Sequence, residues 1–402
     1  MKQNSLTGKS LNRRFLLLQG LLTLLECAST AYLSPIMVSM GYTAGRIGRI
    51  IALAALAAVL CRPIWGFLND RYSCAKQVVF CACTVGTGCY YLLTHSTVVS
   101  LVALSVAGLH ITILCMLNFV DSWALRLISA GYPLDYGGTR AGGSFSYAVG
   151  AVLLGVLITR CGFSAANIIL WGFLALLLWV VAGIPNPPSE REAETKISLR
   201  QGIAVLARNP VYCLMLTAFF LSSLTSGAME SFYPVRILQM GGTEQIVGVA
   251  LFIQAMSEIP IIAGYNRIRQ KTKLSPAAFM GISMLFYGVK AFLTGTAASV
   301  PAAVAVSLLQ ALSYALFVPA SIDFMLHTVQ KEYLATAHLC FIAIGQGAAV
   351  VLGNLFWGAL ADRMGLSQMF CFLALPALAA AVLAFYTGGR QKKINGNKGV
   401  RT

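Results

Sequence analysis

Charged residues are scarce in this chain, and acids are scarcer than bases. Asp, Glu, Lys and Arg make up 10% of the 402 residues, with 13 acids against 29 bases, whereas about a quarter of an average soluble domain is charged. Hydrophobic residues make up 58%. A soluble fold of this length has too little interior to bury so much apolar surface. The composition therefore excludes an ordinary soluble globular protein.

Signals for metals, disulfides and cofactors are also missing. There are only four histidines, and none of the 11 cysteines forms a CxxC pair. Cys27, Cys61 and Cys89 lie inside apolar runs, where cysteine behaves as a small hydrophobic residue. We therefore expect no disulfide framework, no metal site and no cofactor.

Enzyme and nucleic-acid signatures are lacking as well. The sequence contains no HExxH and no GxSxG, and Gly8-Lys9-Ser10 lacks the first glycine of a phosphate-binding loop. The net charge of +16 does not come from one basic patch, because the bases recur between alternate apolar segments. We expect neither an enzyme nor a nucleic-acid partner.

Apolar runs dominate the chain, and each is about 20 residues or longer, enough to cross a bilayer. They predict an all-α polytopic membrane protein, with the lipid bilayer as its surroundings. The twelve predicted helices cover residues 14–39, 46–68, 77–95, 98–127, 138–160, 164–184, 209–238, 245–265, 276–295, 299–328, 336–360 and 367–388.

The distribution of bases predicts the orientation. Segments that alternate helices would place inside are rich in Lys and Arg, as at 191–208 and 267–273, whereas the outside turns hold few bases. The positive-inside rule then places both termini in the cytoplasm and the protein in the cytoplasmic membrane. The first run is longer than a signal peptide allows and contains Glu26, so we interpret it as an uncleaved helix.

The two halves of the sequence repeat one another. A shift of 203 residues places Gly142 on Gly345 and Arg160 on Arg363, and a shift of 202 places Asp121 on Asp323. Glycine-rich helices can align by chance because small residues are common where membrane helices pack, but concordant shifts favour duplication. The predicted organisation is a cytoplasmic tail (1–13), a six-helix bundle (14–184), a cytoplasmic linker (185–208), a second six-helix bundle (209–388) and a basic cytoplasmic tail (389–402).

A short motif follows the second predicted helix. It runs Gly66-Phe67-Leu68-Asn69-Asp70-Arg71 and resembles the G-x-L-x-D-R loop of major facilitator superfamily transporters. The resemblance implies that Gly66, Asp70 and Arg71 form a conformational gating motif, whose acid exchanges partners as the halves move. The alternative is a solvated turn whose charges only set topology.

A wider resemblance covers most of the chain. The block YGGTRAGGSFSYA (136–148), the acid one helix earlier and SEIPIIAGYNRI (257–268) resemble the branch that contains lactose permease, phenylpropionate permease and nucleoside symporters. It implies the major facilitator fold, with Asp121 and Arg140 gripping solute hydroxyls and Tyr147 stacking on the solute. Asp121 with Arg140 as a purely structural pair, and Tyr147 as a packing residue, remain alternatives.

In the second half, the same resemblance makes Glu258 a residue for solute binding and proton coupling, with Lys290 beside it. Burial favours the neutral form of a carboxyl and a nearby ammonium favours its charged form, so the pair could titrate; a permanent salt bridge is the alternative. Gln310 and Ser313 stand where these relatives carry titratable side chains. The candidates for carrying the proton are Glu26, Glu230, Glu258 and Asp323, with Lys290 as a partner.

The sequence therefore predicts a monomeric secondary transporter with two pseudo-symmetric six-helix bundles. We expect alternating access for a small polar solute, such as a sugar or nucleoside, with a proton or another ion coupled to it. An efflux antiporter for amphipathic compounds and a membrane receptor without transport activity are the alternatives.

Overall fold

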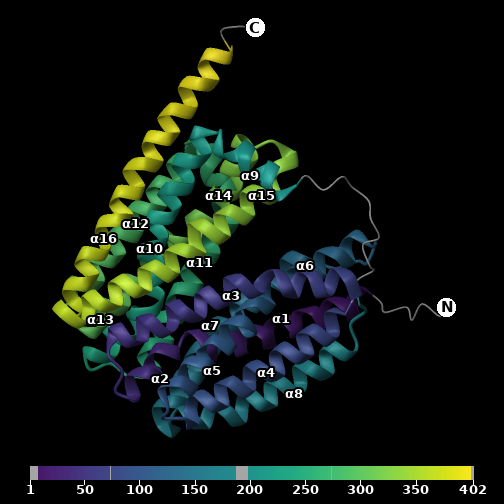
Figure 1. Cartoon of the computed structure of the whole chain (residues 1–402), viewed down its shortest axis with the longest axis vertical. Coiled ribbons are helices and arrows are strands. Elements are labelled where there is room, and N and C mark those ends of the chain that lie inside the picture. Colours follow the sequence, from purple (N-terminus) through teal and green to yellow (C-terminus); the bar gives the residue numbers. More distant parts are fainter. Residues whose placement is uncertain (1–7, 73, 187–197, 273, 400–402) are drawn as a thin grey trace. The chain divides into compact units, whose positions relative to one another are not determined.

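The computed structural model describes residues 8–72, 74–186, 198–272 and 274–399, and the side chains of 63, 66–72, 199 and 391–399 are not described. Every regular element within these ranges is a helix (Figure 1). Eleven stretches there are long and apolar enough to cross a membrane. The last, Lys331–Arg390, extends over 60 residues and is kinked at Gly365 (φ 83°), so it is long enough for two spans. The prediction of an all-α polytopic membrane protein is confirmed.

The chain divides into two compact units. Unit 1 comprises Met1–Tyr42, Leu53–Ala193 and Gly242–Phe252, and unit 2 comprises Thr43–Ala52, Glu194–Gly241 and Ile253–Thr402. The first residues of two helices, α3 (Ala44–Tyr72) and α11 (Glu244–Thr272), therefore lie in the other unit than the predicted bundles place them. Residues 43–52 belong to unit 2 and residues 242–252 to unit 1.

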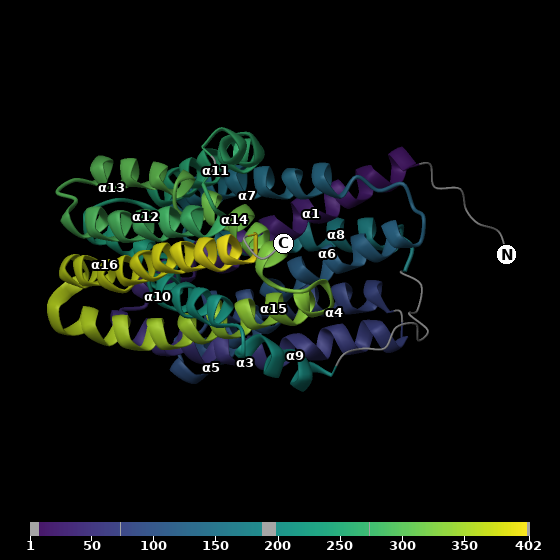
Figure 2. The same cartoon turned by 90° about the horizontal axis from the view of Figure 1, so that it is seen from above.

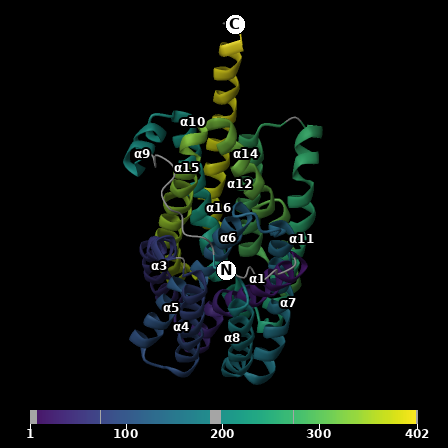
Figure 3. The same ribbon diagram turned by 90° about the vertical axis from the view of Figure 1, so that its right-hand side faces the viewer.

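In unit 1, α1 packs against α6, α7 and α8, and α4 lies beside α8 (Figure 3). Its elements are α1 (Gly8–Thr30), α2 (Leu33–Ser39), most of α3 (Ala44–Tyr72), α4 (Ala75–His95), α5 (Val99–Ile111), α6 (Ile113–Ser129), α7 (Tyr136–Cys161), η1 (Phe163–Ala165) and α8 (Ala166–Ala182).

In unit 2, α16 lies along α10 and α12 (Figure 2). Its elements are α9 (Leu199–Ala207), α10 (Pro210–Gln239), most of α11 (Glu244–Thr272), α12 (Pro276–Thr296), α13 (Val300–Val306), η2 (Ser307–Ala311), α14 (Tyr314–Thr328), η3 (Lys331–Tyr333), α15 (Leu334–Cys340), the π-helix η4 (Phe341–Ala348) and α16 (Ala349–Gly399).

Helix starts are encoded by side chains that accept hydrogen bonds from the first turn. Asp135 caps α7 by accepting from Gly138 N, and Asn209 caps α10 by accepting from the backbone of the next turn. Ser275 does the same for α12, where Pro276 follows as the first helical residue. Each cap satisfies an N–H group that the helix itself leaves unpaired.

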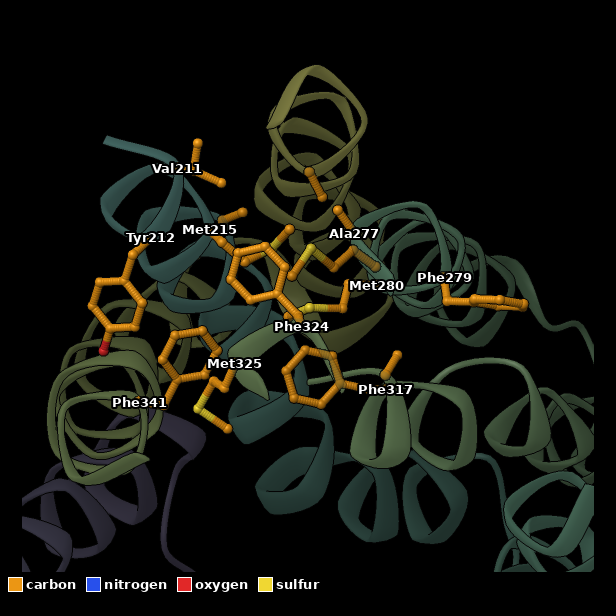
Figure 4. Packing of buried hydrophobic residues seen from close by; sticks show 14 of the residues in the cluster. Val211, Tyr212, Met215, Ala277, Phe279, Met280, Phe317, Phe324, Met325 and Phe341 are labelled. Atoms are coloured by element: carbon orange, nitrogen blue, oxygen red, sulfur yellow. The ribbon is translucent and has the colours of Figure 1, made fainter. Parts of the chain in front are cut away.

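Aromatic and sulfur-containing side chains form the core of unit 2. Phe317, Phe324 and Phe341 pack together with Met215 and Met280 between α10, α12 and α14 (Figure 4). Flexible methionines fill the gaps that rigid rings leave. This core holds in place the helices that carry the polar groups of the unit.

Glycines allow two close helix crossings, one in each unit. In unit 2, a Cβ on Gly48 would lie 2.2 Å from the carbonyl oxygen of Asn354 on α16. In unit 1, a Cβ on Gly248 would lie 2.3 Å from the carbonyl oxygen of Ala151 on α7. Only glycine permits backbones to approach this closely.

Three segments that the sequence predicts as continuous helices are broken, one of them between α1 and α2 at residues 31–32. The other two breaks lie in similar places of the two units. The break between α5 and α6 lies at Thr112 (φ −98°, ψ −81°), and the break before α14 lies at Ser313 (φ −89°, ψ −84°). Neighbouring side chains donate to the backbone there: Trp65 Nε1 to Ile111 O at 2.8 Å, and Ser283 Oγ to Ser313 O at 2.6 Å. Such donors compensate for lost helical hydrogen bonds.

Two segments have more helix than the sequence predicts. The segment with Gly66, Asp70 and Arg71 is not a turn, because α3 continues to Tyr72; the side chains of the motif lie outside the described ones. The predicted linker contains helix α9, whose apolar Gly202 and Leu206 are buried. An amphipathic stretch that packs on a neighbouring helix is stabilised there despite its polar surroundings.

Candidate functional site

Asp121 lies on α6 and is the centre of a polar cluster in unit 1. The side-chain amide of Gln19 on α1 donates from Nε2 to Asp121 Oδ1 at 2.8 Å. Arg140 on α7 forms a looser ion pair with Asp121, with its Nε 3.4 Å from Asp121 Oδ2. The side chains of Asp121 and Arg140 are 18% and 39% exposed, so both charges remain accessible inside membrane-spanning helices.

The side chain of Gln19 on α1 is fully buried where α1 packs against α7. A Cβ on Gly143 would stand 3.4 Å from both Gln19 Cβ and Thr23 Cγ2. Thr23 Oγ1 donates to Gly143 O at 2.9 Å, which joins the two helices one turn away. The small residue at 143 thus lets α1 and α7 close around the glutamine, whose amide has to be hydrogen-bonded because it is out of solvent.

Two tyrosines lie on α7 near this cluster. Tyr136 at the start of the helix lies within interaction range of Asp121 and Arg140. Tyr147 is half-buried two turns beyond Arg140, on the same side of the helix by periodicity. The YGGTRAGGSFSY sequence therefore places a base and a ring on one face and small residues between them.

A second polar group lies in unit 2 and consists of three hydrogen-bonded side chains. They are Lys290 on α12, Gln310 on η2 and Glu258 on α11. Lys290 Nζ donates to Gln310 Oε1 at 2.6 Å, and Gln310 Nε2 donates to Glu258 Oε1 at 3.0 Å. Lys290 is buried at 4% exposure, whereas Glu258 is half-buried. The predicted pair is thus connected through the amide of Gln310.

The remaining acids that were candidates for proton coupling differ in their surroundings. Glu230 on α10 is exposed, and the buried Tyr287 on α12 lies within electrostatic range of both Glu230 and Glu258. Glu26 on α1 is half-buried, two turns from Gln19. Glu230 therefore shares its unit with Glu258, and Glu26 shares its helix with Gln19.

Asp323 on α14 is the most firmly held of these acids. It accepts from Arg269 Nη1 at 2.8 Å and from the Tyr265 hydroxyl at 3.1 Å. His327 Nδ1 lies 3.1 Å from the carboxylate and 2.8 Å from the Asp323 carbonyl oxygen. These contacts hold the carboxylate between α11 and α14.

The structure brings together Asp121 with Arg140, and Glu258 with Lys290, within their respective units. Sequence reasoning missed Gln19 as a partner of Asp121, although a lone amide in LLLQGLL is the kind of polar residue that membrane helices rarely carry without a partner. Among the described residues no group of three or more His, Cys, Asp or Glu side chains could hold a metal ion.

Comparison with known proteins places the chain in a family. The model of the MFS_1 like family matches residues 26–372, which is most of the sequence. The chain belongs to the MFS_1 like family. It is an MFS transporter, a polytopic integral membrane protein and not an enzyme, and the sequence-based identification of the superfamily is confirmed.

Relatives of this MFS transporter align with most of its length. The Uncharacterized transporter YwbF of Bacillus subtilis (strain 168) is 24% identical over 350 residues, which cover 85% of this chain and 84% of the relative. The Maltose permease of Geobacillus stearothermophilus is 23% identical over 356 residues, which cover 86% of each chain. A crystal structure of a mutant of nucleoside transporter NupG has a TM-score of 0.80 at 16% identity, covering 94% of this chain and 99% of that chain. This similarity confirms the major facilitator fold.

Proposed function

We propose that this MFS transporter is a symporter that carries a small hydroxyl-bearing solute, of the sugar or nucleoside class, together with a proton. The observation that supports it most is the cluster of Asp121, Gln19 and Arg140, which offers a carboxylate acceptor and guanidinium donors in a partly accessible place. A hydroxyl group both donates and accepts, so it can satisfy both charges at once. Two distant relatives, a maltose permease and a nucleoside transporter, have names that fit this class.

The proton role is assigned to Glu258. One of its oxygens accepts from Gln310, and the other makes no hydrogen bond with the described residues. Its partial exposure leaves that oxygen accessible to a proton or to a solute hydroxyl. Protonation of Glu258 would leave the buried ammonium of Lys290 without its counter-charge. The net charge of the Lys290–Gln310–Glu258 group therefore depends on whether Glu258 carries a proton.

Uptake into proteoliposomes tests this function. We expect labelled maltose or uridine to exchange across the membrane without a gradient and to accumulate when an inward proton gradient is imposed. Solute that moves in the direction opposite to the protons, or export of hydrophobic cations, would instead indicate an efflux antiporter. If a wide panel of sugars and nucleosides neither moves nor stabilises the purified protein against heat, the proposed solute class is wrong.

A further inference from the structure

Asp121 and Asp323 align at a shift of 202 residues, yet they engage their arginines differently. Asp323 is hydrogen-bonded to Arg269 Nη1 at 2.8 Å. The ion pair between Arg140 and Asp121 is longer, with Arg140 Nε 3.4 Å from Asp121 Oδ2. The short hydrogen bond to Asp121 comes from Gln19.

A carboxylate beside a guanidinium in a poorly solvated place normally takes one or two short charge-assisted hydrogen bonds from it. Asp121 does not: the neutral amide of Gln19 occupies Oδ1 at 2.8 Å, and Oδ2 lies 3.4 Å from Arg140 Nε, with Tyr136 as a further neighbour of both side chains. The two side chains thus compete for one carboxylate, and the amide holds the shorter contact. The Arg140 guanidinium is therefore not closed into a short pair with Asp121.

The amide is well placed to act as a restraint. Gln19 is 0% exposed and packs beside Gly143, so its side chain has little room to change rotamer. A flipped amide would place Oε1 against the carboxylate oxygen, which is repulsive, so the donor orientation is fixed by Asp121 itself. The other amide atom, Gln19 Oε1, is buried and accepts no hydrogen bond from the described residues.

We propose that Gln19 is a positioning residue that restrains Asp121 and thereby keeps the guanidinium of Arg140 available to the solute. The inference rests on the proposed function, since it takes Arg140 as a solute-binding group. Without the amide, Asp121 turns both oxygens toward Arg140 and the two charges satisfy each other. A hydroxyl-rich solute then has to break that pair before it binds.

The experiment compares two variants of the full chain in proteoliposomes. Gln19→Met removes the amide with little change in volume. Thr23→Val is the matched control, because it removes a hydrogen bond from α1 to a neighbouring helix, here to Gly143 O on α7, and leaves Asp121 untouched. The first readout needs no solute: the rate at which phenylglyoxal modifies Arg140, followed by mass spectrometry of its peptide.

We expect Gln19→Met to slow the modification of Arg140 at least about fivefold, since a closed charge-assisted pair shields the guanidinium. Thr23→Val should leave the rate close to that of the original protein. An unchanged Arg140 rate in Gln19→Met overturns the proposal, and so does an equal change in both variants, which would show a purely structural role.

The second readout is exchange of labelled maltose and uridine. For whichever probe is transported, Gln19→Met should raise the half-saturating concentration severalfold while the maximal rate is largely kept; a lowered maximal rate at unchanged half-saturation contradicts the proposal. If the original protein carries neither probe, the proposed solute class fails, and the Arg140 reactivity alone still decides the role of Gln19.

Discussion

Lys290 donates to the side-chain oxygen of Gln310 at 2.6 Å, and this contact fixes the orientation of the Gln310 amide. With Oε1 occupied by the ammonium, the amide nitrogen faces Glu258 and donates to it. A glutamine cannot carry a proton near neutral pH. The amide therefore transmits hydrogen-bond polarity between the two charges but cannot relay a proton, so under the proposed function Glu258 itself has to take it up.

Replacing Gln310 with Leu should destabilise the protein by about 1–3 kcal/mol, because a buried ammonium and a carboxylate each lose a hydrogen-bond partner. Thermal unfolding of the purified protein measures the effect. Gln254→Leu is the matched control, since Gln254 makes only a 3.5 Å contact with Ser307 Oγ. Equal losses in both variants would show that the bridge adds no stability.

Asp121→Asn should abolish solute binding while membrane insertion and folding are kept. The asparagine oxygen can still accept from Gln19, so the packing survives, but the charge opposite Arg140 is gone. Equilibrium binding of labelled solute checks this. Asp135→Asn, at the exposed cap of α7, is the control that should bind normally because asparagine caps helices equally well. Wild-type affinity in Asp121→Asn would remove Asp121 from the site.

Glu258→Gln should uncouple transport from the proton gradient. The amide oxygen can still accept from Gln310, but the residue no longer changes charge. We expect solute exchange at equal concentrations to continue and accumulation driven by an inward proton gradient to disappear. Glu332→Gln alters an exposed acid on η3 and should leave both processes intact. Gradient-driven accumulation in Glu258→Gln would move the proton role to Glu230 or Glu26.

Asp323→Asn should reduce stability and leave proton coupling in place. Removing one partner of a buried ion pair costs about 3–5 kcal/mol, and we expect less here because the Arg269 side chain is 32% exposed. Tyr265→Phe removes a single donor to the same carboxylate and should cost less than Asp323→Asn. Loss of coupling with unchanged thermal stability would identify Asp323 as a proton carrier and contradict its structural role.

Gly48→Ala and Gly248→Ala should each lower thermal stability by about 1–3 kcal/mol, because the new methyl group forces the crossing helices apart. The clash is with the backbone oxygens of Asn354 and Ala151, which cannot move aside as a side chain would. Gly172→Ala is the control: its Cβ meets nothing within 4 Å, and the better helix propensity should make it neutral or stabilising by up to about 1 kcal/mol.

The helices were predictable because a bilayer demands long apolar runs, and this demand dominates local propensity. The breaks at Thr112 and Ser313 were not, since both lie in long, mostly apolar runs without a proline or glycine at the break. Helix α9 was missed because its nine residues are too few to cross a bilayer and follow a charged segment, and packing is what stabilises it.

The site was predictable where charges stand in apolar helices. Asp121 and Arg140 are such charges, and the structure joins them. Gln19 was missed because an uncharged amide is a weaker signal and its partner lies on another helix, far along the chain. Gln310 was recognised only as the replacement of a titratable residue, whereas its hydrogen bonds to both neighbours depend on three helices that the sequence alone does not align.

The breaks at Thr112 and Ser313 bear on the history of the chain. They stand 201 residues apart, close to the shifts that align the two halves, and their backbone dihedrals agree within about ten degrees. A shared irregularity of this kind is simplest to explain if it already existed in an ancestral unit of six helices before that unit was doubled. On this explanation, the side chains that donate to the backbone at the breaks have diverged: an indole from α3 donates at one break and a serine from α12 at the other. The backbone geometry of the break has been kept in both halves.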